Sequence, residues 1–278
     1  MQLLKDTLFE GERALFQAEN ISLQGCTFAN GESPLKHSLN VIAENTRFSW
    51  KYPLWYSQDI RVKNCTFDDT ARAGIWYTDN ISVTDTTYNA PKGFRRCDIL
   101  HIENVTMPNA LETLWACKNV TLKNITAKGD YFGMNSEDLI IDGLTLDGNY
   151  CFDGARNVTV KNSRLLSKDA FWNAENITCE NCYIEGEYLG WNSRSLTFVN
   201  CTIKSVQGLC FVDLLKLRGC KLEGTTLAFE YSHVDAEITG SIDSVKNPSS
   251  GIIKAGSIGQ LIMEPEKVDV TQTNIITE

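Results

Sequence analysis

The residues best suited to chemistry in this chain are aromatic and charged side chains that recur at a regular spacing. Several tryptophans stand five residues before the first apolar residue of successive sequence repeats. When the repeats are aligned, these tryptophans form one column, and charged or tyrosine residues stand in or near that column. Such a surface suits a sugar chain, because sugar C–H faces pack on aromatic rings and charged groups bond the hydroxyls, and exposed aromatic patches usually mark contact sites. The residues predicted to bind a ligand are Trp55, Trp76, Arg95, Glu112, Trp115, Trp172, Tyr188 and Trp191.

A second set of residues has the types needed for catalysis on sugars. Acid–base hydrolysis of a glycosidic bond needs two carboxylates about 5–10 Å apart. Asp153 stands in the tryptophan column, and Asp130 and Asp169 stand near it on neighbouring repeats. A lyase would instead use cations to bind a sugar carboxylate, for which Arg95 and His37 are the candidates. Solvated charges on an outer face are the alternative interpretation for all five residues.

These residues are positioned by a repeat of 19–21 residues. Asn, Asp or Gly follows four residues after the first apolar residue of every copy, and these types tolerate a left-handed backbone, which predicts a turn there. The segment before the turn alternates apolar and polar residues, which is typical of a strand. The first apolar residues of the copies are Ile21, Val41, Ile60, Ile81, Leu100, Val120, Leu139, Val158, Ile177, Leu196 and Leu215.

Short strands with a turn in every copy predict a right-handed parallel β-helix of about 12 turns. We expect one domain over residues 1–278, with an N-terminal cap and partial turn at 1–19, regular turns at 20–242 and an irregular C-terminal cap at 243–278. A leucine-rich repeat has a similar period, but its Leu spacing and helical return segment do not appear. We also predict asparagine ladders, in which the turn residues bond from one turn to the next.

The direction of the tryptophan column follows from its neighbours. The residue before each tryptophan is apolar or glycine, as at Leu54, Ile75 and Leu114, so we assign that residue to the core. Adjacent residues of a strand face opposite sides, which places the tryptophans outside.

Composition excludes several classes of protein. The net charge of −9 argues against nucleic-acid binding. The first residues do not resemble a signal peptide and no segment is long and apolar enough to span a bilayer, so we expect a cytoplasmic protein without membrane contact. We expect the ten cysteines to be buried, reduced thiols, including the Cys179 and Cys182 pair, and we expect no metal or cofactor.

The chain also resembles a bacterial family. The phrases FEGERALF, GESPLKHS, KYPLWYS, VKNPSSG and IKAGSIG lie towards both ends of the sequence. They are similar to the domain-of-unknown-function family numbered 3737, within the pectate-lyase-like β-helix superfamily. The resemblance implies one β-helix domain and supplies no catalytic residues.

Two functional hypotheses follow. In the first, the protein binds or processes an oligosaccharide or polysaccharide along the aromatic face, and as an enzyme it would be a polysaccharide lyase or a glycoside hydrolase. In the second, it is a non-enzymatic scaffold or homo-oligomer whose aromatic face contacts protein.

Overall fold

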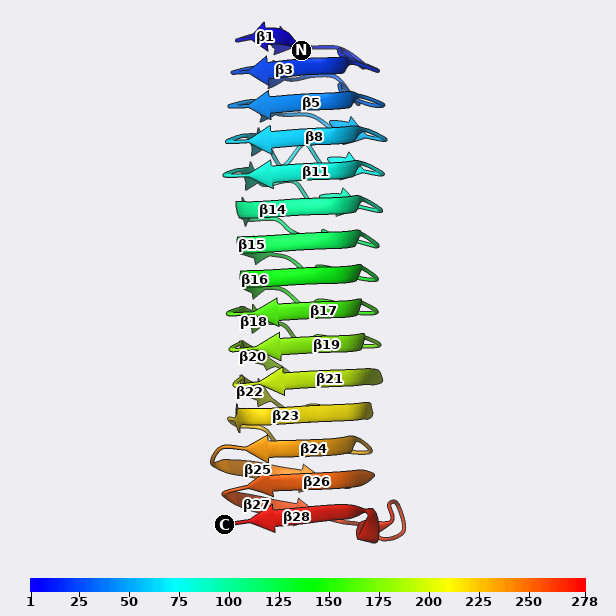
Figure 1. Ribbon diagram of the computed structural model, residues 1–278, viewed down its shortest axis with the longest axis vertical. Coiled ribbons are helices and arrows are strands. Elements are labelled where there is room, and N and C mark those ends of the chain that lie inside the picture. Colours follow the sequence, from blue (N-terminus) through cyan, green and yellow to red (C-terminus); the bar gives the residue numbers. More distant parts are fainter. The chain divides into compact units, whose positions relative to one another are not determined.

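The computed structural model describes residues 1–278. The chain divides into two compact units, Met1–Thr145 and Leu146–Glu278, and each is described by itself. Both units are stacks of short parallel strands, which confirms the predicted β-helix. Within each unit the chain winds in the right-handed sense (Figure 1). The structure contains no helix with the length and hydropathy needed to cross a membrane.

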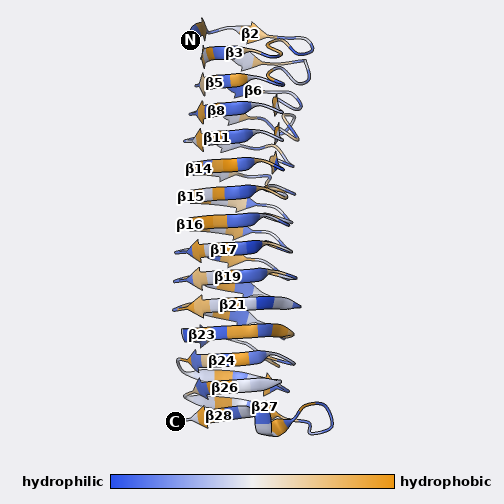
Figure 2. Ribbon diagram, turned by 45° about the vertical axis from the view of Figure 1, so that its right-hand side comes forward, coloured by the Kyte–Doolittle hydropathy of each residue, from blue (hydrophilic) through white to orange (hydrophobic).

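The first strands of the turns of unit 1 pair in parallel and in register. Val41, for example, pairs with Ile21 on one side and with Ile60 on the other. Inward Val and Ile alternate with outward polar residues, so polar and apolar segments alternate along the strands (Figure 2). These strands are β1 (Gln2–Lys5), β3 (Glu19–Gln24), β5 (Leu39–Glu44), β8 (Gln58–Lys63), β11 (Asp79–Thr84), β14 (Asp98–Met107), β15 (Lys118–Lys128) and β16 (Glu137–Asp147), the last of which runs past the end of the unit.

Two shorter sets of strands complete the turns of unit 1. The second set carries a buried aromatic stack in which Phe48 lies 5.3 Å from Phe28 and 4.5 Å from Phe67. The third set carries the predicted tryptophan column. The second set is β2 (Leu8–Phe9), β4 (Thr27–Phe28), β6 (Arg47–Phe48), β9 (Thr66–Phe67) and β12 (Thr87–Tyr88), and the third is β7 (Leu54–Trp55), β10 (Ile75–Trp76) and β13 (Phe94–Arg95).

The loop between the second and third sets varies in length. It is two residues longer between Phe67 and Trp76 than between Phe48 and Trp55. The rest of the turn keeps its spacing, so this loop accounts for the spread of the repeat period in unit 1.

The corners of the turns are left-handed residues, as the Asn and Gly pattern predicts. Asn45 and Asn64 have φ angles of 49° and 50°. A further left-handed corner directly follows the tryptophan column, where Tyr56 and Tyr77 have φ angles of 55° and 53°. Since a left-handed residue breaks the alternation of a strand, Trp55 and Tyr56 can both lie outside the core although they are adjacent.

Unit 2 repeats this construction. Its first strands are β17 (Arg156–Lys161), β19 (Glu175–Glu180), β21 (Ser193–Val199), β23 (Val212–Leu222), β24 (His233–Ile238), β26 (Ser250–Ala255) and β28 (Thr273–Thr277). The others are β18 (Arg164–Leu166), β20 (Tyr183–Gly186), β22 (Thr202–Ser205), β25 (Ser241–Lys246) and β27 (Ser257–Ile262), and the 3₁₀ helix η1 covers Val270–Gln272.

The predicted count of about 12 turns is too low, because the protein has about 15. At the start, β1 pairs with β3 in register although its inward slot holds the polar Gln2 opposite Ile21. At the end, β26 and β28 continue the parallel pairing although proline and longer loops break the sequence period. Backbone pairing therefore extends beyond the segment in which the side-chain pattern is regular.

All ten cysteines are buried and free, as predicted. Cys182 and Cys201 do not bond to each other covalently, and their thiols contact backbone carbonyls instead. The Cys201 thiol, for example, lies 3.4 Å from the carbonyl oxygen of Cys179 on the preceding turn. The Cys179 and Cys182 pair is thus part of the core of unit 2.

Candidate functional site: a polar groove and an aromatic stack

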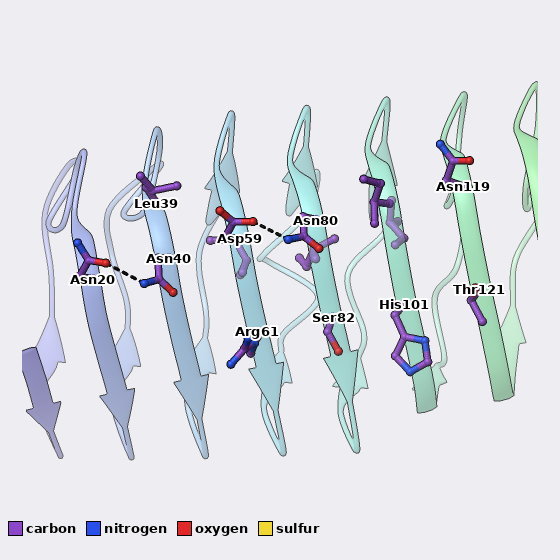
Figure 3. A pocket seen from close by; sticks show the side chains of 14 residues that line it. Asn20, Leu39, Asn40, Asp59, Arg61, Asn80, Ser82, His101, Asn119 and Thr121 are labelled. Atoms are coloured by element: carbon purple, nitrogen blue, oxygen red, sulfur yellow. Dashed lines mark hydrogen bonds between the residues drawn. The ribbon is translucent and has the colours of Figure 1, made fainter. Parts of the chain in front are cut away.

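A groove of about 590 Å³ lies on the outer face of unit 1, over strands β3 to β15. Its polar side chains come from two positions of the turns, the first left-handed residue of the strand and the outward residue two places later (Figure 3). Apolar residues next to the left-handed position complete the lining. We call this surface the unit 1 groove. It is lined by Asn20, Leu39, Asn40, Asp59, Ile60, Arg61, Asn80, Ile81, Ser82, Ile99, Leu100, His101, Asn119 and Thr121.

One side of the groove is a row of amide and carboxylate groups. Asn40 and Asn80 have left-handed φ angles of 53° and 54°, a conformation that Asn adopts readily. The Asn40 amide donates to Oδ1 of Asn20 at 2.7 Å, and the Asn80 amide donates to Oδ1 of Asp59 at 2.5 Å (Figure 3). These bonds join adjacent turns in pairs. A continuous asparagine ladder stays a prediction.

The other side of the groove carries Arg61, Ser82, His101 and Thr121, which are in register on adjacent strands. Arg61 is exposed and forms no ion pair, so its guanidinium is available to a ligand. His101 lies 3.5 Å from a carboxylate oxygen of Glu103. The groove therefore offers hydrogen-bond donors and acceptors on both sides.

The carboxylate beside His101 is held in its charged form. Glu103 accepts a hydrogen bond from Lys123 at 2.7 Å, and this bond, with a smaller contribution from His101, lowers the pKa of Glu103. Glu103 thus stays ionised next to the edge of the groove at neutral pH.

The predicted tryptophan column of unit 1 is a continuous stack. Trp55 and Trp76 lie 5.0 Å apart and nearly parallel, with an angle of 5° between the rings. Arg95 follows in register, with its guanidinium carbon 4.6 Å from the Trp76 ring and 4.7 Å from the Trp115 ring. Glu112 accepts a hydrogen bond from Arg95 at 2.9 Å. The structure thus brings together all five unit 1 residues that we predicted to bind a ligand.

The stack is half-buried, and the preceding residues Leu54 and Ile75 are fully buried, which agrees with the predicted outward direction. Both faces of the Trp76 ring are covered, one by Trp55 and the other by Arg95. The indole N–H of Trp76 donates to the carbonyl of Lys92 at 2.9 Å. The stack therefore presents ring edges to solvent rather than ring faces.

His37 belongs to a second aromatic row, on the left-handed corner beside the tryptophans. It stacks on Tyr56 at 5.2 Å, and Tyr56 stacks on Tyr77 at 4.8 Å. Arg95 and His37, the cations proposed for a lyase, therefore occupy different columns of unit 1. The catalytic role of each stays a prediction.

The ligand candidates of unit 2 also contact one another. Trp172 and Trp191 lie 6.3 Å apart with tilted rings, and Tyr188 packs edge-on against Trp191 at 6.0 Å. The indole N–H of Trp172 donates to the carbonyl of Tyr188 at 2.6 Å. As in unit 1, these side chains support each other.

The three carboxylate candidates have different surroundings. Asp153 accepts a hydrogen bond from Asn173 at 2.9 Å. Asp169 is buried, and burial raises its pKa, with a smaller opposing effect from Lys168 and from a hydrogen bond with Tyr150. Asp130 lies in unit 1, whereas the other two lie in unit 2. The proposed pairing of Asp130 with them stays a prediction.

Sequence reasoning missed the unit 1 groove. The turn predicted from the sequence lies four residues after the first apolar residue of each copy, whereas the groove Asn residues stand directly before that residue. The outward positions of the strands, such as Arg61 and His101, are not part of the predicted site. The available signal is the column two residues after the left-handed residue at the start of each strand, where charged and hydroxyl side chains accumulate in unit 1.

Comparison with known proteins gives a family and a fold. The model of the family described as "Protein of unknown function (DUF3737)" matches residues 2–276. No curated protein sequence matches the chain.

The matching solved structures are distant. The surface adhesin PfbA of Streptococcus pneumoniae is 12% identical, with 78% of this chain and 71% of that chain covered and a TM-score of 0.40. The mannuronan C-5 epimerase AlgE6 A-module of Azotobacter vinelandii is 10% identical, with 95% and 90% covered and a TM-score of 0.37. A tailspike protein of Escherichia coli bacteriophage HK620, in complex with a hexasaccharide, is 8% identical, with 95% and 66% covered and a TM-score of 0.38. Likenesses of this size carry no argument about function.

Proposed function

The chain belongs to the DUF3737 family, whose description gives no activity, and from the geometry of unit 1 we propose that the protein binds a carbohydrate chain in the unit 1 groove. The observation that carries this proposal is the pair of polar columns that face one groove over successive strands. The groove supplies amides, a carboxylate, two hydroxyls and an arginine that forms no ion pair.

The chemistry of these groups matches that of sugars. A sugar hydroxyl both donates and accepts, and the side chain of Asn80 can do the same through its NH₂ group and its oxygen. Arg61 adds up to five N–H donors from a fixed plane. An extended groove lined in this way suits a chain of hydroxyl-rich units better than a compact apolar ligand.

The spacing of the turns supports a chain rather than a single sugar. Adjacent strands lie roughly 4.8 Å apart, which is close to the length of one sugar unit in an extended chain. Arg61, Ser82 and His101 form one column, in which one side chain follows the next at this interval. Successive sugar units would therefore meet side chains in similar positions.

The aromatic stack has a different place in this proposal. The ring faces of Trp76 are covered, so sugar rings cannot pack on them. Sugar binding at the ring edges of the stack stays a prediction, as does the alternative that the stack joins two copies of the protein.

The proposal is tested with a glycan array, followed by calorimetric titration of the best ligand with the full chain. Arg61→Ala should weaken binding about tenfold or more, because it removes a charged hydrogen-bond donor. Arg72→Ala is the matched control, since Arg72 is an exposed arginine of unit 1 outside the groove. The proposal fails when no glycan binds, or when the two variants weaken binding equally.

A further inference from the structure

One residue of the unit 1 groove differs in type from the residues at the same position of the neighbouring turns. The left-handed position at the start of each strand holds Asn or Asp on the flanking turns, but Ile99 occupies it in β14. Its φ angle is 56°. A β-branched residue in this region is an outlier, because its Cβ substituents crowd the backbone, and Asn fits there with far less strain.

Ile99 also interrupts the amide row. Asn80 on one side bonds to Asp59, and Asn119 on the other side bonds to Asp98 at 2.7 Å rather than to Ile99. The strand that carries His101 lies between those that carry Asn80 and Asn119 (Figure 3). The polar row of the groove therefore has an apolar gap in its middle.

The Ile99 side chain does not contribute to the core. It is 55% exposed and lines the groove. Packing thus gives no reason for an isoleucine at a backbone position that disfavours it. Ile99 is the β-branched residue among the left-handed residues of the chain, and an outlier that packing does not explain supports a hypothesis of function.

We infer that Ile99 is an apolar subsite that selects a saccharide bearing a methyl substituent, such as a 6-deoxy sugar. This inference rests on the proposed carbohydrate function. The neighbouring amides bond the sugar hydroxyls, and Ile99 contacts the methyl group, because its side chain offers a hydroxyl no hydrogen-bond partner. Burial of one methyl group against Ile99 gives a preference of about fourfold.

The test compares sugars that differ only in whether C6 is a methyl or a hydroxymethyl group, namely glycosides of L-rhamnose with those of L-mannose, and of L-fucose with those of L-galactose. Ligand-observed NMR titration of the full chain measures the affinities. We expect the 6-deoxy member of at least one pair to bind about fourfold more tightly. Ile99→Asn should remove this preference and raise Tm, because Asn relieves the backbone strain.

Leu214→Asn is the matched control. Leu214 occupies the same left-handed slot in unit 2, with φ of 63° and 41% exposure, and it does not line the unit 1 groove. Leu214→Asn should raise Tm and leave the preference for the 6-deoxy sugar unchanged.

The outcomes separate the two levels of the proposal. Absence of binding to every glycan overturns the proposed function. Binding without a preference for the 6-deoxy member, or a preference that survives Ile99→Asn, overturns the role of Ile99 alone. A fall in Tm for Ile99→Asn also overturns it, since the side chain would then stabilise the fold.

Discussion

Arg95 should be a main source of stability on the outer face of unit 1. Its guanidinium lies between the Trp76 and Trp115 rings and bonds to Glu112. Each cation–π contact at a half-exposed site contributes about 0.5–1 kcal/mol, and a solvent-screened ion pair contributes at most about 1 kcal/mol. Arg95→Ala should therefore lower the free energy of unfolding by about 2 kcal/mol. Arg95→Lys should lose about half as much, because it keeps the charge but not the planar group.

Urea denaturation followed by tryptophan fluorescence measures these changes. Four of the six tryptophans lie in unit 1, so the signal mainly reports this unit. Arg96→Ala is the control, because Arg96 is exposed and adjacent but lies outside the tryptophan column, and we expect a change within about 0.5 kcal/mol. A double-mutant cycle with Glu112→Gln isolates the ion pair. Equal effects of Arg95→Ala and Arg96→Ala would refute the reasoning.

Two further predictions concern buried titratable groups. Burial raises the pKa of Asp169 above its ordinary value of 3.8, so its ionised form costs stability at neutral pH, and this cost disappears as pH falls below the ordinary value. Asp169→Asn should stabilise the protein at pH 7 but not near pH 3, and thermal unfolding at both pH values checks this; a constant difference would contradict it. Burial also raises the pKa of Cys65 to about 11 and that of Cys151 to about 12. A thiolate-specific reagent at pH 8 should therefore label no thiol of the native protein and ten after unfolding in urea, whereas rapid native labelling of Cys65 or Cys151 would show that the thiol is accessible.

Sequence patterns predicted the β-helix because its corners and its core each leave a signal in every copy. Asn64 marks a left-handed corner, and Ile60 marks an inward strand position. The corner at Tyr56 leaves no such signal, since tyrosine does not identify a left-handed residue. Alternation alone therefore could not explain how Trp55 and Tyr56 both lie outside the core.

The site was harder to predict than the fold for a physical reason. Aromatic residues at the same position of successive repeats must have adjacent side chains. The sequence does not show whether their ring faces meet each other or a ligand. The rings of Trp55 and Trp76 meet each other. The unit 1 groove instead depends on outward residues of successive strands, such as Arg61, whose types vary from turn to turn, so their column is a weaker signal than the constant types of the corner and the core.

The variable loop between Phe67 and Trp76 indicates where the chain accepts additional residues. An insertion within a first strand such as β8 would move inward side chains to the outer face and break the register with both neighbours. An insertion beside the exposed Asp69 would leave every paired strand in place, and lengthening a surface loop costs little. This loop is therefore the natural position in unit 1 for grafting a peptide or a reporter without disturbing the stack.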